Sequence, residues 1–203
     1  MSARNTLLRR VRDAARHEVP HPGPFRPLPG VSGWERFAET LCSVGGEPVG
    51  PVLRAELGQT LVELCRSAGS GRVVAGAGVA ELAGEGAWEG VPEGVSPRSL
   101  ADVEIAILRG SIGVAENGAV ALEGKHARVR ALPFLCARLV LLLEVAAIVP
   151  DMHQATSRMP EDAMCFHHFT WISGPSKTAD IEQTLVLGAH AARSLAVVGI
   201  RDP

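Results

Sequence analysis

Residues 172–182, ISGPSKTADIE, begin at the end of an apolar run and contain three hydroxyls, a lysine and two acids. Gly174 and Pro175 predict a turn, and Ser176, Lys177 and Thr178 follow it. Such residues after a strand and before a helix are typical of an anion site, because the first backbone N–H groups of a helix and its positive dipole end attract negative charge.

The simpler interpretation of this segment is a capped helix without a ligand. The pattern predicts a helix over about 177–188, in which Ser176 or Thr178 caps the first turn and Asp180 and Glu182 favour it electrostatically. Two acids near a helix start would also repel a phosphate. An anion site therefore requires Lys177 as its counter-charge and acids that point elsewhere.

Two segments partly match nucleotide-binding motifs, but neither match is complete. A Walker A loop needs Gly-Lys-Ser/Thr with a second glycine five residues earlier, whereas Lys177 follows Ser176 and position 172 is isoleucine. The run GAGVAE at 76–81 begins like a dinucleotide loop, but Glu81 replaces its third glycine and no βαβ unit follows. We predict neither a nucleotide triphosphatase nor a dinucleotide site.

A carboxylate stands in a second turn, VAENGAVAL. Asn117-Gly118 between apolar segments favours a type I′ hairpin turn with a solvated Glu116. The alternative is that Glu116 is held at a strand end as a nucleophile or a general acid or base, which requires desolvation by its surroundings.

The histidines and cysteines lack the spacing of a metal site. His167 and His168 are adjacent, but neither they nor His153 and His190 form HxH or HExxH patterns, and the four cysteines include no CxxC pair. We expect buried reduced thiols, no metal and no iron-sulfur cluster bound by this chain.

Composition bounds the class of protein. The chain has 203 residues, 46% hydrophobic and 21% charged, with a net charge of −2, as in a globular protein with a sizeable core. Its only strongly basic stretch is N-terminal, so we expect no nucleic-acid partner. Its longest apolar run, at 139–143, is too short to span a bilayer, and the N-terminus lacks the apolar core of a secretory signal, so we expect a cytosolic protein.

The N-terminal 30 residues stand apart. Residues 3–17 predict an amphipathic helix, and residues 19–30, with five prolines, predict an extended arm. This segment, 1–30, would either contact a partner or remain a solvated tail. The remainder, 31–203, predicts a single domain.

Within that domain, apolar periodicity predicts helices from Trp34 and from about Arg54, an extended piece at 48–53, a strand and turn at 71–78, and a surface loop at 83–97. Short apolar runs then predict strands, with helices at 150–159 and 177–188. The strands are VEIAIL, the two arms of VAENGAVAL, ARLVLLLE, FTWIS and SLAVVGI. Their alternation with helices indicates an α/β fold, a mostly parallel sheet with helices on both faces.

The run ISGPSKTADIEQTLVLGAHAAR strongly resembles the C-terminal signature of the LUD-domain family, of the lactate-utilisation protein C type. The segments IGVAENGAVAL and RALPFLCARLVLLLEVAAIVPDMHQA match the order and spacing of that family's middle region. The resemblance covers about residues 33–200. Many members carry Glu-Thr-Gly-Thr where this chain has residues 116–119, ENGA, and His-Gly-Pro-Arg where it has 190–193, HAAR.

The resemblance implies a fold like that of ribose-5-phosphate isomerase, glucosamine-6-phosphate deaminase and the coenzyme A transferases. It implies an active site at the ends of parallel strands, so both turns are candidates for its rim. Coenzyme A transferases carry a Ser-Glu-Asn-Gly turn whose glutamate is acylated, and residues 115–118, AENG, look similar. The implied site has Glu116 as its catalytic group, facing an anionic or coenzyme A-like ligand. The implied ligand-binding residues are Asn117, Gly118, Gly174, Ser176, Lys177, Thr178 and Asp180.

The resemblance implies a role in oxidising L-lactate to pyruvate beside iron-sulfur protein subunits. We therefore expect an accessory or ligand-binding component that takes a small anionic metabolite. A free-standing enzyme of the coenzyme A transferase or sugar-phosphate isomerase type, using Glu116, is the first alternative. An inactive regulatory or scaffold homologue is the second, which the changes at Asn117, Ala119, Ala191 and Ala192 would permit.

Overall fold

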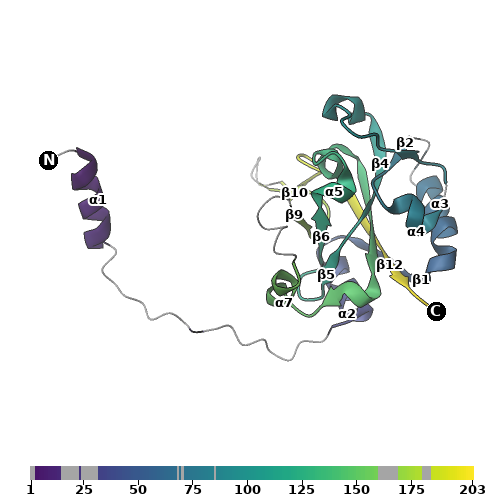
Figure 1. Cartoon of the computed structure of the whole chain (residues 1–203), viewed down its shortest axis with the longest axis horizontal. Helices are drawn as coiled ribbons and strands as arrows, with labels where there is room; N and C mark the ends of the chain where they lie inside the picture. The colour runs from purple at the N-terminus through teal and green to yellow at the C-terminus, as the bar shows by residue number, and fades with distance from the viewer. Residues whose placement is uncertain are drawn as a thin grey trace.

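The computed structural model describes residues 3–14, 23, 32–67, 69, 71–84, 86–159, 169–179 and 184–203. Helix α1 (Ala3–Ala14) forms most of the predicted N-terminal helix, and every one of its residues is exposed (Figure 1). Of the predicted proline arm only Gly23 is described, so that prediction lies outside the described residues. None of the helices in the described part of the chain is long and apolar enough to cross a membrane.

A six-stranded sheet forms the centre of the domain, and all of its neighbouring strands are parallel. In spatial order the strands are β1 (Glu47–Leu53), β12 (Ser194–Arg201), β7 (Arg138–Glu144), β4 (Val103–Arg109), β2 (Arg72–Ala75) and β3 (Glu89–Gly90). The central strands are continuous aliphatic runs that are buried along nearly their whole length, as parallel strands covered on both faces require.

Helices cover one face of this sheet. Leu57 and Leu61 of α3 (Leu57–Ser67) and Val79 of α4 (Val79–Ala83) pack in one buried cluster with Ile105 and Ile107 of β4. A 3-10 turn, η1 (Arg54–Glu56), leads from β1 into α3.

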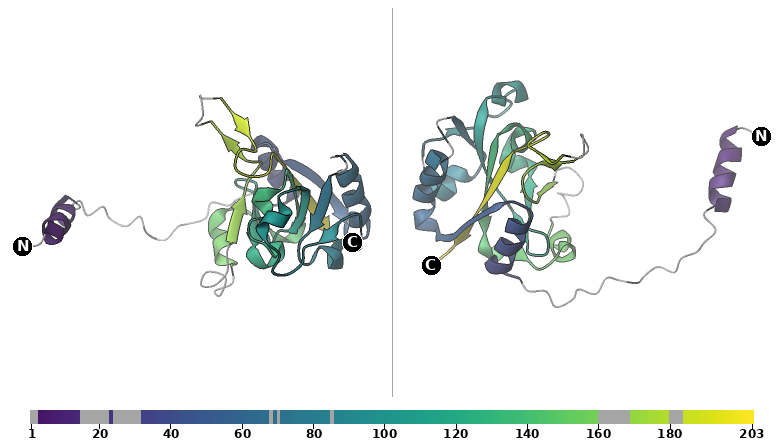
Figure 2. Two further views of the ribbon diagram at one scale, coloured as in Figure 1. Left: turned by 90° about the horizontal axis from the view of Figure 1, so that it is seen from above. Right: turned by 180° about the vertical axis from the view of Figure 1, so that it is seen from behind.

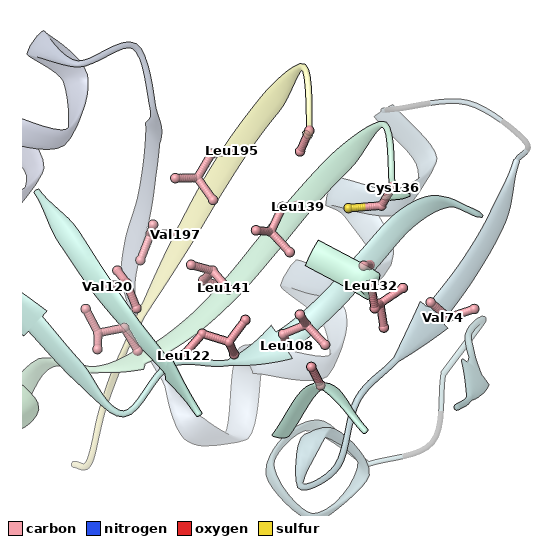
Figure 3. Close-up of a cluster of buried hydrophobic side chains, with 14 of the residues drawn as sticks. Val74, Leu108, Val120, Leu122, Leu132, Cys136, Leu139, Leu141, Leu195 and Val197 are labelled. Carbon is pink, nitrogen blue, oxygen red and sulfur yellow. The ribbon is translucent and has the colours of Figure 1, made fainter. Parts of the chain in front are cut away.

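The opposite face is covered by helix α2 (Trp34–Ser43) together with a second, smaller sheet. That sheet has the order β8 (Ile148–Val149), β5 (Ile112–Val114), β6 (Ala119–Glu123) and β9 (Phe169–Ile172), with β5–β6 and β6–β9 antiparallel and β5–β8 parallel. Val120 and Leu122 of β6 lie in the same cluster as Leu141 and Val197 of the large sheet (Figure 3). The predicted α/β fold is confirmed, and the small sheet shares with α2 the face that helices alone were expected to cover.

Short elements complete the domain: η2 (Pro97–Leu100), α5 (Gly124–Ala127), α6 (Leu132–Leu135), η3 (Val145–Ala147) and α7 (Met152–Ser157). Asp151 caps α7 by accepting a hydrogen bond from the backbone N–H of Gln154 at 2.8 Å. The helix predicted at 150–159 is therefore present, and the loop predicted at 83–97 contains the short edge strand β3.

The helix predicted over 177–188 is wrong. In its place β10 (Lys177–Thr178) pairs antiparallel with β11 (Val186–Leu187), and this hairpin projects from the domain (Figure 2). Leu185, which the helical pattern would bury, is instead 61% exposed. Cross-strand pairing of Thr178 with Val186 suits β-branched residues better than a helix does.

Candidate functional site

The Glu-Asn-Gly turn joins β5 to β6 through four residues, 115–118. The backbone N–H of Gly118 donates to the carbonyl of Val114 at 2.9 Å, and Val114 pairs with Ala119 across the hairpin. A type I′ turn has two central residues with positive φ, but here Gly118 has φ 66° and Asn117 has no positive φ. The predicted type I′ turn is therefore wrong, and Asn117 instead accepts the N–H of Ala119 with its side-chain Oδ1 at 3.0 Å.

Glu116 lies exposed at the tip of this turn. Its Oε2 accepts a hydrogen bond at 3.2 Å from the backbone N–H of Met152, the first residue of α7. A carboxylate at a helix N-terminus is favoured because it satisfies an otherwise unpaired N–H and complements the helix dipole. In this structure Glu116 therefore supports the start of α7.

The turn rests on the last part of α2. Thr40 Oγ1 is 3.0 Å from the carbonyl oxygen of Ala115, and a Cβ added to Gly118 would lie 2.9 Å from both N and Cα of Leu41. Ser173, which follows β9, donates its hydroxyl to the carbonyl of Asn117 at 2.7 Å. The two turns that the sequence singled out are thus neighbours in space.

The second turn is anchored to the same helix end. Lys177 donates from Nζ to the carbonyl of Val44, the C-cap residue of α2, and a Cβ on Gly174 would lie 2.5 Å from that carbonyl oxygen. A lysine at a helix C-terminus satisfies an unpaired carbonyl and complements the dipole. We call residues 115–118 and 173–178, with the end of α2, the turn junction.

The turn junction lies at the amino-terminal edge of the large sheet. Val44 shortly precedes β1, and Ala192, whose carbonyl accepts the N–H of Ser176 at 2.9 Å, shortly precedes β12. Thr178 belongs to β10, and Asp180 lies outside the described residues. Because a β-hairpin replaces the predicted helix, no helix dipole acts on an anion at Ser176 or Lys177.

A cleft of about 400 Å³ opens beside the junction, at the same edge. Its walls are the start of β4 with Asp102, helix α6 with Phe134, and the loop 188–193 with His190 and Arg193. The family resemblance includes His190 and Arg193 but does not place them in a site, and the sequence does not identify Asp102 or Phe134. The acids on either side of Val103, at the start of an apolar strand, are the sequence pattern that could have indicated Asp102.

Asp102 also faces Arg72 across the sheet edge. The guanidinium of Arg72 donates to Asp102 at 2.9 Å and to Glu89 at 3.1 Å. The hydrogen bond from Arg72 holds the pKa of Asp102 below its ordinary value, with a further contribution from a backbone hydrogen bond. Asp102 is therefore ionised over a wider pH range than a free aspartate.

A second cleft, of about 330 Å³, lies at the carboxyl ends of β2 and β3. It is lined by the loop 76–78, Trp88, Val91 and Arg128. The expectation that no βαβ unit follows this loop is wrong, because α4 connects β2 to the parallel strand β3. The sequence does not identify Arg128 as a lining residue. Among the residues that the structure describes, no three His, Cys, Asp or Glu side chains are grouped to hold a metal ion.

Comparison with known proteins identifies relatives of this arrangement. A family model described as "LUD domain" matches residues 94–200. "Lactate utilization protein C" of Bacillus pumilus is 40% identical over 83 residues, covering 38% of this chain and 34% of that protein. The protein of the same name from Geobacillus thermodenitrificans is 30% identical over 102 residues, covering 48% and 42%. The chain thus matches less than half the length of these curated relatives.

A crystal structure of a DUF162 family protein from Deinococcus radiodurans has the same fold, with a TM-score of 0.62 and 16% sequence identity, covering 82% of this chain and 95% of that one. The family match at 94–200 includes both turns of the turn junction and every residue lining the amino-edge cleft. Because that match takes in more than half of the 203 residues, the chain belongs to the LUD domain family.

Proposed function

We propose that this protein is a ligand-binding accessory component of L-lactate, or closely related organic-acid, oxidation, and that it works beside iron-sulfur protein subunits. The relatives named lactate utilization protein C support the metabolic assignment. The partners would carry the redox centres, and this chain would contribute a small-anion site and a docking surface.

The observation that carries the proposal is that polar and apolar side chains within the family-matched residues are exposed on one part of the surface. Glu116 and Lys177 are both exposed, and each is hydrogen-bonded to a backbone group at a helix end. Nearby, the hairpin exposes Leu185 (61%) and Leu187 (49%), and α6 exposes Phe134 (44%) at the cleft, where the loop 188–193 that follows β11 forms another wall. Large apolar side chains that form an exposed patch beside polar groups are typical of a protein-binding surface.

The cleft beside this patch provides the anion site of the proposal. Arg193 and His190 lie on one wall, and Arg suits a carboxylate because its guanidinium binds both oxygens at once. L-Lactate or pyruvate at about 100 times its dissociation constant would stabilise the fold by roughly 2.7 kcal/mol. A thermal-shift titration of the wild type and Arg193→Ala measures this directly, and equal shifts in both would remove Arg193 from the site.

The free-standing enzyme with Glu116 as nucleophile gains less support. A glutamate needs desolvation to become a good nucleophile or general base, whereas Glu116 is exposed and accepts a hydrogen bond from a helix N–H. Glu116→Gln retains an acceptor for Met152 and so leaves the fold intact. If that variant abolished lactate-dependent turnover in the reconstituted system, the catalytic role would be reinstated.

Reconstitution tests the accessory role. Purified iron-sulfur subunits of a lactate-utilisation system would be assayed for L-lactate-dependent reduction of a dye, with and without this chain. We expect the chain to raise the rate, and Leu187→Glu to remove most of the increase. Ala55→Glu is the matched control, since Ala55 is exposed in η1, which follows the carboxyl end of β1.

Two results would reject the proposal. One is a rate that does not depend on the chain at any concentration. The other is an equal loss with Leu187→Glu and Ala55→Glu, which would mean that charge, and not the apolar hairpin, determines the effect.

A further inference from the structure

The cleft at the carboxyl ends of β2 and β3 lies outside the functional surface described above. Most of its lining comes from residues 75–91, which precede the family match at 94–200. Ligands of parallel α/β sheets bind at the carboxyl ends of strands, where connecting loops surround a concave site. At about 330 Å³ the cleft has room for a small metabolite.

One wall of the cleft is the loop 76–78, Gly-Ala-Gly, in which the alanine methyl is the only side chain. The N–H of Gly76 donates to the carbonyl of Ile107 at 2.9 Å, and that of Ala77 donates to the carbonyl of His126 at 2.9 Å. A Cβ at Gly76 would lie 2.2 Å from the carbonyl oxygen of His126. The loop after β2 and the backbone of α5 are therefore in close contact at this wall.

Arg128 lines the cleft in an unusual conformation. Among the described residues it is the one non-glycine residue with a positive φ, at φ 56° and ψ −42°. Strained backbone of this kind concentrates at binding and catalytic sites. The Arg128 side chain lines the cleft, and its Nη1 donates to Glu93 Oε1 at 3.1 Å.

The Arg128–Glu93 ion pair is open to solvent. The Glu93 side chain is 89% exposed and that of Arg128 is 36% exposed, so solvent screens the attraction and the pair holds weakly. Lys125 is paired with Glu123, and Glu81 lies on the cleft wall as an exposed acid. Arg109 adds a second positive charge, with Cδ 3.7 Å from the Cβ position of Gly78.

We propose that this cleft binds a small anion, a carboxylate or a phosphate ester, which takes the place of Glu93 on Arg128. The anionic group meets the guanidinium, and the remainder of the molecule lies between the loop 76–78 and the apolar side chains of Trp88 and Val91. Glu93 then acts as an internal competitor for the site.

The test uses intact protein titrated with inorganic phosphate and, separately, with butyrate, followed by tryptophan fluorescence and thermal unfolding. Saturable binding of either probe, with loss of the fluorescence change in Trp88→Phe, is expected. The probe that binds more tightly distinguishes a phosphate site from a carboxylate site. Glu93→Gln should tighten binding several-fold because the competing carboxylate is gone.

Arg128→Gly separates a binding role from a structural one. Glycine adopts φ 56° without strain, so this variant should unfold at a temperature equal to or above the wild type while its affinity for the probe falls at least ten-fold. Affinity unchanged in Arg128→Gly, or no saturable binding of either probe to the wild type, would overturn the proposal. Weaker binding in Glu93→Gln would overturn the competition between Glu93 and the ligand.

Discussion

Gly118→Ala tests how firmly the Glu-Asn-Gly turn is seated on α2. Two separate effects lower the free energy of unfolding in this variant. At φ 66° alanine is in the left-handed region, which costs roughly 1–2 kcal/mol. Its Cβ would also lie 2.9 Å from backbone atoms of Leu41, which cannot rotate away, and overpacking of this kind costs about 1–3 kcal/mol. The expected loss in the free energy of unfolding is about 2–5 kcal/mol.

Gly94→Ala is the matched control. Gly94 has φ 69°, close to that of Gly118, but nothing lies within 4 Å of its Cβ position. The two variants share the left-handed strain and the reduced entropy of the unfolded chain, so their difference isolates the contact with α2. We expect Gly94→Ala to lose about 1–2 kcal/mol and Gly118→Ala to lose about 1–3 kcal/mol more.

Urea denaturation followed by circular dichroism provides the measurement. The midpoint for Gly118→Ala should fall below that of Gly94→Ala with an unchanged slope, since the slope reports the surface exposed on unfolding. In thermal unfolding each kcal/mol corresponds to about 2–4 °C for a domain of this size. Equal losses in the two variants would refute the close packing of the turn on α2.

Three further expectations concern single side chains. Lys177→Met removes the cation at the end of α2 and should lower the free energy of unfolding by about 0.3–1 kcal/mol. Lys177→Arg keeps the cation and should show a smaller loss of free energy in the same denaturation experiment. Arg72 lowers the pKa of Asp102 in the folded protein. The stabilisation from Asp102 should therefore be present above the unfolded-state pKa of about 3.9 and be lost as pH falls through the folded pKa. In Arg72→Met, NMR should show the Asp102 carboxyl titrating at a higher pH. Burial raises the pKa of the Cys136 thiol to about 12. At pH 8 iodoacetamide should therefore label the exposed Cys42 before Cys136, as measured by mass spectrometry. Equal labelling of the two cysteines in the native protein would contradict the burial of Cys136.

Much of the fold could be predicted from local pattern. The continuous aliphatic runs at β4, β7 and β12 identified buried parallel strands, and the spacing of Leu57 and Leu61 identified a core-facing helix. These signals are strong because burial on both faces of a strand, or on one side of a helix, constrains many positions at once. The small sheet depends on the pairing of β5 with β8 and of β6 with β9. These strands are distant in sequence, so no local hydrophobic period predicts their pairing.

The region after Ser176 shows where local pattern fails. Its acids and apolar residues fit a helix, but tertiary pairing of Lys177 with Leu187 determines the structure. The proximity of the two turns could not be predicted either, because it depends on α2, whose end receives both Gly118 and Lys177. The clefts were missed because Arg128, Asp102 and Phe134 are far apart in sequence from the residues they face.

The position of β12 has a consequence for how the protein is made. This strand comes last along the described chain, yet it is inserted between β1 and β7 in the sheet, and it is the strand with which β1 pairs. During synthesis β1 emerges about 150 residues before its partner, a long loop to close and typical of slow-folding topologies.

Until residues 194–201 leave the ribosome, β1 and β7 each present an unpaired edge. Open strand edges invite pairing with other chains, so nascent or C-terminally truncated forms of this protein should depend on chaperones to a degree that the finished domain does not.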